Sequence, residues 1–129
     1  MFEMLILLFA CHWIGDFIFQ TRYIADNKGK NNYVLTLHVF IYTLTLFVGI
    51  CAYTAIRQDF FGVHPSYDRW DVSIFLVANF VLHWITDFTT SRITKYFWAK
   101  QDIHKFFATI GFDQMLHQIC LLVTLRTML

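Results

Sequence analysis

Four long apolar stretches, separated by polar segments, make up the chain. They predict helices over about 2–20, 33–56, 72–98 and 110–129. Each stretch has roughly the twenty residues that a helix needs to cross the hydrocarbon core of a bilayer. We expect the polar segments between them to be connections: residues 21–32, residues 57–71 and the charged region within 91–108. Gly62 and Pro65, which are typical of loops, lie in the segment 57–71. We therefore expect an all-α protein in which residues 1–129 form one membrane domain, a bundle of four transmembrane helices.

Composition favours a membrane protein over a soluble one. Hydrophobic residues make up 57% of the chain, aromatic residues 19% and charged residues 15%. A soluble domain carries about a quarter charged residues, so this chain lacks the charge to cover a surface that faces water. The net charge of +1 gives no reason to expect a nucleic acid as partner. A signal peptide is the alternative for the first stretch, but it carries Glu3 in place of a basic start and has no cleavage site, so we expect it to stay as a helix.

The placement of positive charge predicts the orientation. Because four spans alternate in direction, the end of the first, the start of the second, the end of the third and the start of the fourth face one side. The cations expected on that side are Arg22, Lys28, Lys30, Arg92, Lys95, Lys100 and Lys105, against Arg57, Arg69 and Arg126 on the other. By the positive-inside rule the lysine-rich side is cytoplasmic and both termini are outside.

One motif occurs twice. The sequence HWIxDF stands at residues 12–17 and returns at 83–88, each time inside an apolar stretch. A histidine and an aspartate four residues apart lie on the same face of a helix, one turn from each other, so each copy can hold a metal ion. His38 and His117 occupy matching places in the helices that follow. The repeat predicts two related helical hairpins with an axis along the membrane normal.

Seven ionisable side chains lie at one expected depth, close to mid-span or nearer the lysine-rich side. They are His12, Asp16, His38, His83, Asp87, Asp113 and His117. An ionisable residue inside a bilayer is costly and marks a functional site by default. The alternative is a polar network that only holds the helices together. Three His/Asp pairs at four-residue spacing, together with His38, favour a shared metal centre.

The charges balance for two divalent ions. Three aspartates and a bridging hydroxide cancel the four positive charges of two such ions, with the histidines neutral. The predicted ligands of one metal are His12, Asp16 and His38, those of the other are His83, Asp87 and His117, and the predicted bridging ligand is Asp113. Imidazole and carboxylate ligands favour zinc, with manganese or iron as alternatives. Three protein ligands per ion leave an open position, which is the catalytic pattern.

Other polar residues are weaker candidates. Those placed to orient the ligands are Gln20, Tyr42, Asn79, Gln114 and Gln118, although plain helix–helix contacts explain them almost as well. His64 and His104 fall in expected loops and are not assigned to the site. The cysteines form no CxxC pair and read as small buried hydrophobic residues: Cys11, Cys51 and Cys120.

In this order, the motifs HxxxDFxxQ (12–20), His38, HxxxD (83–87) and FDQxxH (112–117) resemble a family of small, uncharacterised integral membrane proteins of bacteria and their phages. More loosely, they are similar to membrane-bound metal-dependent hydrolases. The resemblance covers nearly the whole chain. It implies a hydrolase in a bacterial inner membrane, which is the host's membrane if the source is a phage. One departure is the stretch 89–91, where that family often has a lysine, so Arg92 or Lys95 would have to take its place.

The expected function is hydrolysis of an anionic substrate, such as a phosphorylated lipid or a nucleotide, at the cytoplasmic side. The metals would activate water, with Asp16 or Asp113 as general base. The cations expected to ring the mouth are Arg92, Lys95, Lys100 and Lys105, unless they only set the orientation and bind lipid headgroups. Two alternatives stay open. One is a transporter of metal ions or protons, with a homodimer interface as its path, and the other is a small membrane adaptor whose metal is structural.

Overall fold

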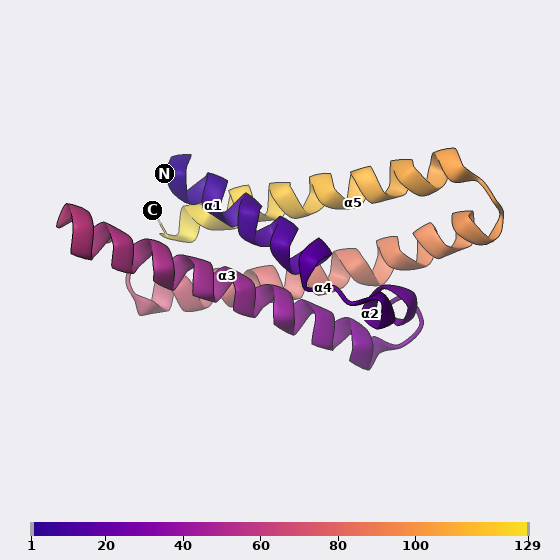
Figure 1. The fold of residues 1–129 in the computed structure, drawn as a ribbon, viewed down its shortest axis with the longest axis horizontal. Helices are drawn as coiled ribbons and strands as arrows, with labels where there is room; N and C mark the ends of the chain where they lie inside the picture. The colour runs from indigo at the N-terminus through magenta and orange to yellow at the C-terminus, as the bar shows by residue number, and fades with distance from the viewer. Residues whose placement is uncertain (1, 129) are drawn as a thin grey trace.

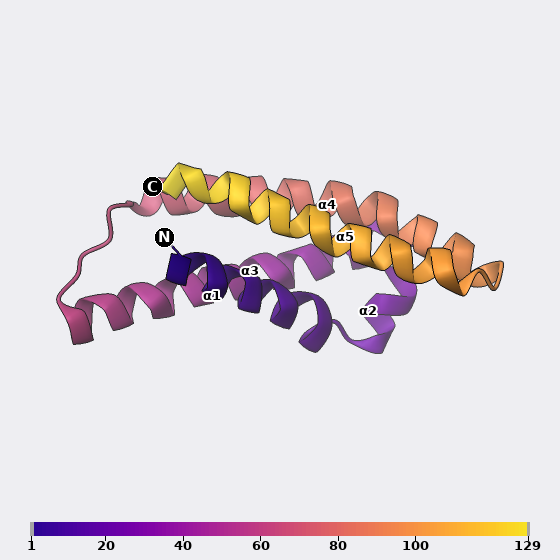
Figure 2. The same ribbon diagram turned by 90° about the horizontal axis from the view of Figure 1, so that it is seen from above.

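The computed structural model describes residues 2–128, and within that range it is helical without any strand. The elements are α1 (Phe2–Trp13), the π-helix η1 (Ile14–Ile18), α2 (Arg22–Asn27), α3 (Asn32–Phe61), α4 (Arg69–Ala99), α5 (Ile103–Thr124) and the 3₁₀-helix η2 (Leu125–Met128). Figure 2 shows two layers, with α1 and α3 in one and α4 and α5 in the other. Each of α1 and α4 packs against both α3 and α5. The predicted all-α class is confirmed for the described residues.

Among residues 2–128, three helices are long and apolar enough to cross a membrane, so the prediction of four spans is wrong in number. They are α3, α4 and the continuous stretch Ile103–Met128 formed by α5 and η2. The first apolar stretch falls short because its α-helix ends at Trp13 and continues only to Ile18, as a π-helix. In Figure 1, α1 accompanies the longer helices over part of their length and ends near the middle of the molecule.

The long helices extend further than the apolar stretches predicted. α3 ends at Phe61, followed by Gly62 in the left-handed conformation (φ 62°), which glycine adopts without strain. α4 and α5 are joined by residues 100–102 alone, so the expected loop over 91–108 is mostly helix and His104 lies in the first turn of α5. Lysine and arginine are good helix formers. A lysine or arginine at the end of an apolar stretch therefore shows where the surroundings of the helix become polar, but the helix itself can continue. In Figure 1, this hairpin projects beyond α3.

The first connection folds back on the bundle. Thr21 caps α2 by accepting a hydrogen bond from the Ile24 amide (3.3 Å). Ile24 is itself buried and anchors the short helix. Asn31 then caps α3, accepting from the Tyr33 amide (2.8 Å). Two caps only ten residues apart hold the loop between them close to the bundle.

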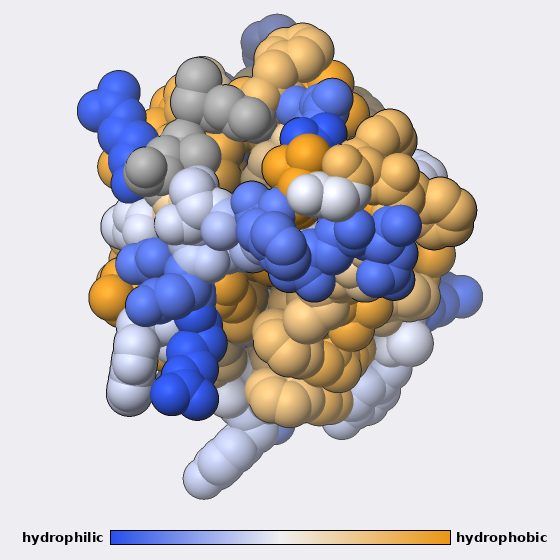
Figure 3. Space-filling view, turned by 90° about the vertical axis from the view of Figure 1, so that its left-hand side faces the viewer, coloured by the Kyte–Doolittle hydropathy of each residue, from blue (hydrophilic) through white to orange (hydrophobic). Residues whose placement is uncertain are grey.

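An apolar core fills the end of the bundle at which the two chain ends lie. Its buried members are Met4, Leu8, Cys11, Tyr42, Leu46, Ile50, Phe75, Leu121, Leu125 and Met128. Cys11 packs so closely on Gly49 that a β-carbon there would collide with its sulfur. Cys120 is partly buried, but Cys51 is exposed because it faces outward from α3, and the prediction that it is buried is wrong. Figure 3 looks onto this end, where hydrophilic side chains lie among hydrophobic ones.

Candidate metal centre

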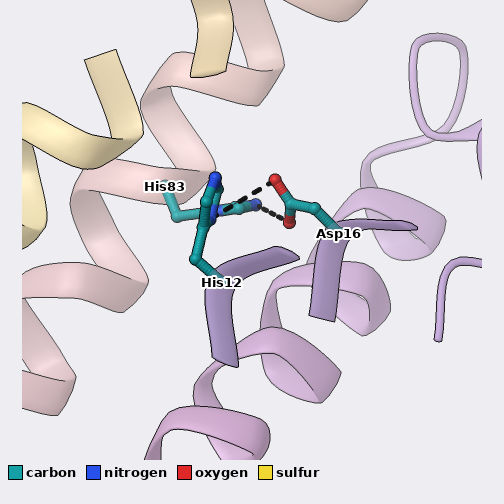
Figure 4. Close-up of side chains that lie close together, drawn as sticks. All are labelled: His12, Asp16 and His83. Atoms are coloured by element: carbon teal, nitrogen blue, oxygen red, sulfur yellow. Dashed lines mark ion pairs between the residues drawn. The ribbon is translucent and has the colours of Figure 1, made fainter. Parts of the chain in front are cut away.

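The seven ionisable side chains come together between the two layers. Six of them have exposed fractions of only 1–4%: His12, Asp16, His38, His83, Asp87 and His117. The side chain of Asp113, at the edge of the cluster, is 14% exposed. Four elements besides the π-helix contribute, so residues more than a hundred positions apart share one site. Figure 4 shows His12, Asp16 and His83 pointing toward one another from opposite layers.

Two histidine nitrogens lie between the same two carboxylates. His83 Nε2 is 3.4 Å from Asp16 Oδ1 and 3.6 Å from Asp87 Oδ2. His38 Nε2 is 3.5 Å from Asp16 Oδ1 and 3.2 Å from Asp87 Oδ2. The two nitrogens are 3.3 Å apart. Donor atoms from α3, α4 and the π-helix therefore converge on one small, buried volume.

The cluster continues toward α5. His117 Nε2 lies 3.1 Å from Asp87 Oδ1 and 3.4 Å from Asp113 Oδ1. The His117 ring stacks on the His83 ring, with centroids 4.0 Å apart. Thr90 donates a hydrogen bond to Asp113 Oδ1 (2.5 Å). Asp87 thus has one oxygen toward α5 and the other toward α3, which makes it the centre of the network.

Three overlapping groups have ligand atoms within 4.8 Å of one another, close enough to share an ion. They are His12, Asp16 and His83; His38, His83 and Asp87; and Asp16, Asp113 and His117. Each group draws on both hairpins, whereas the sequence analysis gave one triad to each hairpin. The difference arises because the two copies of the motif face each other across the layers. His83 therefore approaches Asp16 of the other copy (3.4 Å) as closely as Asp87 of its own (3.6 Å).

A chain of hydrogen bonds orients the His12 ring. Gln114 Nε2 donates to Asp113 Oδ2 (3.1 Å), which leaves Gln114 Oε1 to accept from His12 Nε2 (3.0 Å). With the proton on Nε2, the lone pair of a neutral His12 ring lies on Nδ1, 3.6 Å from Asp16 Oδ2. Two acceptors facing each other in a buried site do not stabilise each other, whereas a cation between them would be stabilised by both.

Unsatisfied atoms mark the same place. His12 Nδ1 and Asp16 Oδ1 are buried and have no hydrogen-bond partner within residues 2–128, and the same holds for His38 Nδ1, His83 Nδ1 and Gln20 Oε1. Buried polar atoms are normally paired. The donor set of imidazoles and carboxylates is the one that zinc, manganese and iron take in proteins, so the residues present fit a divalent ion.

The aromatic ring of Tyr42 packs against two of the histidines, His83 and His12, and helps to position them. The Tyr42 ring stacks on His83, with centroids 3.9 Å apart, and meets the His12 ring edge-on at 5.6 Å. Gly15 in the π-helix permits this contact, since a β-carbon there would lie 3.2 Å from Tyr42 Cδ2 and 3.3 Å from its Cα. Tyr42 therefore contributes its ring to the site, where the sequence analysis expected a polar contact.

The other predicted neighbours differ in their placement. Gln114 bonds to His12, as described. Asn79 instead donates to Thr124 Oγ1 and to a backbone carbonyl, both at 2.8 Å. Gln20 lines the cleft beside the cluster, and Gln118 is exposed. Among these residues, Gln114 is the one that orients a candidate ligand.

Lys28 enters the cluster from the loop after α2, and the sequence analysis did not assign it to the site. Its Nζ lies 2.7 Å from Asp87 Oδ2 and 3.3 Å from His38 Nε2, and its side chain is 15% exposed. Burial lowers the pKa of the Lys28 ammonium, but the carboxylates of Asp87 and Asp16 outweigh burial and raise this pKa above the usual value of a lysine. Lys28 is therefore a fixed positive charge within the site. In the sequence, Lys28 looks like any other lysine in a loop, and only the fold of this loop shows that it contacts the cluster.

A cleft of about 380 Å³ leads from the cluster to the lysine-rich end of the molecule. Its polar lining includes Asp16, Asp87, Asp113, Lys28 and Lys95, and its apolar lining includes Phe17, Trp98, Phe106 and Ile110. Lys95 donates to the backbone carbonyl of Asp26, across the cleft from α4. The site is therefore buried but open on the side where the sequence analysis placed its mouth.

The other cations predicted to meet substrate lie elsewhere. The Arg92 guanidinium donates to the carbonyl of Phe88 (2.6 Å) and lies over the Phe88 ring. Lys100 lies over the Tyr96 ring, and Lys105 pairs with Asp102 (2.9 Å). Of the predicted cations, only Lys95 lines the described cleft, and Lys28 joins it.

Comparison with known proteins places the chain in a family. No curated protein and no solved structure matches it. A family model described as "Protein of unknown function (DUF3307)" matches residues 4–129, which include the whole cluster, Lys28 and the cleft. The resemblance to an uncharacterised family is thereby confirmed, while the looser similarity to hydrolases stays a prediction. Because the match covers nearly its full length, the protein belongs to the DUF3307 family.

Proposed function

We propose that this protein is a membrane-embedded, metal-dependent hydrolase that acts on an anionic lipid at the cytoplasmic face of a bacterial inner membrane. α3, α4 and α5 would cross the bilayer, and the shorter path through α1, the π-helix and α2 would run from the outer side to the lysine-rich end inside, so that both ends of the described chain lie outside. The observation that carries the proposal is the buried cluster of four histidines and three aspartates at the closed end of a cleft that opens toward the lysines.

The ion would bind first beside Asp16. His12 Nδ1 and Asp16 Oδ1 are two of the buried atoms that have no hydrogen-bond partner in the described chain, and His83 Nε2 lies 3.4 Å from the same Asp16 oxygen. Zinc is the first candidate, followed by manganese and iron. A divalent ion held by these residues would lower the pKa of water toward neutrality and polarise the substrate oxygen.

Asp113 is the better placed of the two predicted general bases. Its side chain is 14% exposed and lines the cleft, whereas that of Asp16 is 4% exposed and surrounded by histidines. Thr90 and Gln114 each donate a hydrogen bond to one of its oxygens, which fixes the plane of the carboxylate. Asp113 would take the proton of the attacking water while Asp16 holds the ion.

The cleft favours a phosphorylated lipid over a nucleotide. Trp98 and Phe106 pack on each other in its wall, with ring centroids 5.0 Å apart, and Ile110 continues the apolar surface. Lys28 and Lys95 supply positive charge at its polar side. An amphiphile would lay its chain against the rings and place its phosphate near the ammonium groups.

Transport is less well supported. Leu8, Leu46, Phe75 and Leu121 are each 0% exposed and fill the bundle between the cluster and the end where the chain termini lie. A path through one chain would have to cross this packed apolar core, at a high cost for any ion. Within the described residues, the cluster is therefore reached through the cleft on one side, which favours an enzyme over a transporter.

The test uses the full chain in vesicles that contain phosphatidic acid, with bound metal measured in parallel by mass spectrometry. We expect bound zinc and release of phosphate. Asp16→Asn should lose both, and Asp113→Asn should keep zinc but lose turnover. Asp59→Asn, at an exposed aspartate near the end of α3, is the matched control and should change neither. A protein that binds no divalent metal contradicts the proposal. Zinc bound without hydrolysis also contradicts it and favours the adaptor with a structural metal.

A further inference from the structure

We infer that Lys28 takes the place of a second metal ion, so that the centre binds one divalent cation per chain and not two. The inference rests on the proposed metal-dependent function and concerns the composition of the same site. Lys28 Nζ contacts Asp87 Oδ2 (2.7 Å) and His38 Nε2 (3.3 Å). His38 and Asp87 both belong to one of the three groups that can hold an ion. An ammonium and a metal ion therefore compete for that group.

The charge of the cluster gives the first argument. With the histidines neutral, as metal-binding imidazoles are, the three aspartates carry three negative charges and Lys28 one positive charge, so two negative charges remain. One divalent ion cancels them. A second ion would leave the buried cluster with excess positive charge even if a hydroxide bridged the two, and uncompensated charge in a buried site is costly. The count of two ions expected from the sequence omitted Lys28.

The sharing of ligands gives the second argument. The Nε2 atom of His83 is the one that faces both Asp16 (3.4 Å) and Asp87 (3.6 Å). A single ring nitrogen has one lone pair and binds one ion. An ion beside Asp16 therefore takes His83 away from the group around Asp87, so a second ion would have to bind through His38 and Asp87, the two residues that Lys28 contacts.

The hydrogen bonds of the Asp87 and Asp16 carboxylates show which of the two ion positions Lys28 occupies. Both oxygens of Asp87 have partners, Oδ1 in His117 (3.1 Å) and Oδ2 in Lys28 (2.7 Å). Asp16 Oδ1 and His12 Nδ1, in contrast, have no hydrogen-bond partner among residues 2–128. The ammonium thus neutralises the Asp87 side, and the place for an ion lies on the Asp16 side.

Metal stoichiometry tests the inference. The purified full chain is loaded with zinc, dialysed and analysed for zinc per chain. We expect one ion on the wild type and two on Lys28→Met, which keeps the length of the side chain but removes its charge. Lys30→Met, at an exposed lysine two residues further on, is the matched control and should keep one. Lys28→Arg keeps the charge and should also keep one.

A second readout does not depend on counting alone. With cobalt in place of zinc, the wild type should show the full electron paramagnetic resonance signal of one isolated ion. In Lys28→Met two neighbouring cobalt ions should couple and weaken the signal per ion. Two zinc ions on the wild type, or one on a folded Lys28→Met, overturn the inference and leave the hydrolase proposal standing. If Lys28→Met does not fold, the number of zinc ions per wild-type chain still tests the inference. Absence of zinc from the wild type overturns the proposed function itself.

Discussion

In the proposed centre, Gln114 should control which nitrogen of His12 is available to a metal, and its removal should weaken metal binding. Gln114 Oε1 accepts a hydrogen bond from His12 Nε2 (3.0 Å), and the amide is itself held by Asp113 (3.1 Å). In Gln114→Met the ring loses this partner, and its proton can move to Nδ1, the atom that faces Asp16. Loss of such an outer partner typically reduces metal affinity by about 10–100-fold. That factor corresponds to about 1.4–2.7 kcal/mol of binding free energy.

The assay is a competition titration of zinc between the purified protein and a fluorescent chelator, which gives the zinc dissociation constant. Gln118→Met is the matched control, because Gln118 lies one turn further along α5 and is exposed. We expect the dissociation constant to rise in Gln114→Met and to stay unchanged in Gln118→Met. If both variants bind zinc equally well, His12 Nδ1 is not a ligand.

Three further predictions follow from the packing. Gly15→Ala should lower the free energy of unfolding by about 1–3 kcal/mol, because the added β-carbon would press on Tyr42 at 3.2 Å. Gly111→Ala is the control and should not lower it, because no atom lies within 4 Å of the added β-carbon. Unfolding in mixed detergent micelles measures both free energies. Trp98→Ala should reduce kcat/KM for a lipid phosphate about tenfold and leave hydrolysis of p-nitrophenyl phosphate unchanged. Trp70→Ala, at an exposed tryptophan in the first turn of α4, is the control, and equal losses on both substrates would contradict a lipid-binding role. Proteoliposomes should take up no zinc beyond that of protein-free vesicles, and uptake would show that the apolar core is not closed.

The sequence alone predicted which side chains gather, because a bilayer makes ionisable residues expensive. Each of the four histidines and three aspartates interrupts an otherwise apolar stretch, and all seven meet in the structure. Their spacing along the chain could not tell how they pair. The pairing depends on which sides of the helices meet between the two layers. This packing places His83 beside Asp16.

Lys28 and the length of the helices were missed for a related reason. A lysine in a polar connection looks like a topological signal, and hydropathy does not show that the caps at Thr21 and Asn31 fold this loop onto the bundle. The charged segment that follows Asp87 looked like a loop for the same reason, although it is helix as far as Ala99. Hydropathy reports the surroundings of a residue, whereas helix ends are set by caps and turns.

The two copies of HWIxDF have different local structures, and this difference separates the roles of their aspartates. In α4 the variable position is Thr86 and the helix stays regular. In the first copy it is Gly15, and the backbone widens into a π-helix in which the Phe19 amide bonds to the Ile14 carbonyl (2.9 Å). π-helical turns are common at functional sites because they redirect a side chain. Asp16 is left among three histidines with an oxygen that has no hydrogen-bond partner in the described chain, while the regular copy presents Asp87 to an ammonium. In the proposed centre, the repeated motif thus provides one carboxylate for a metal ion and one for Lys28, so the similarity of the two hairpins in sequence does not imply two equivalent metal sites.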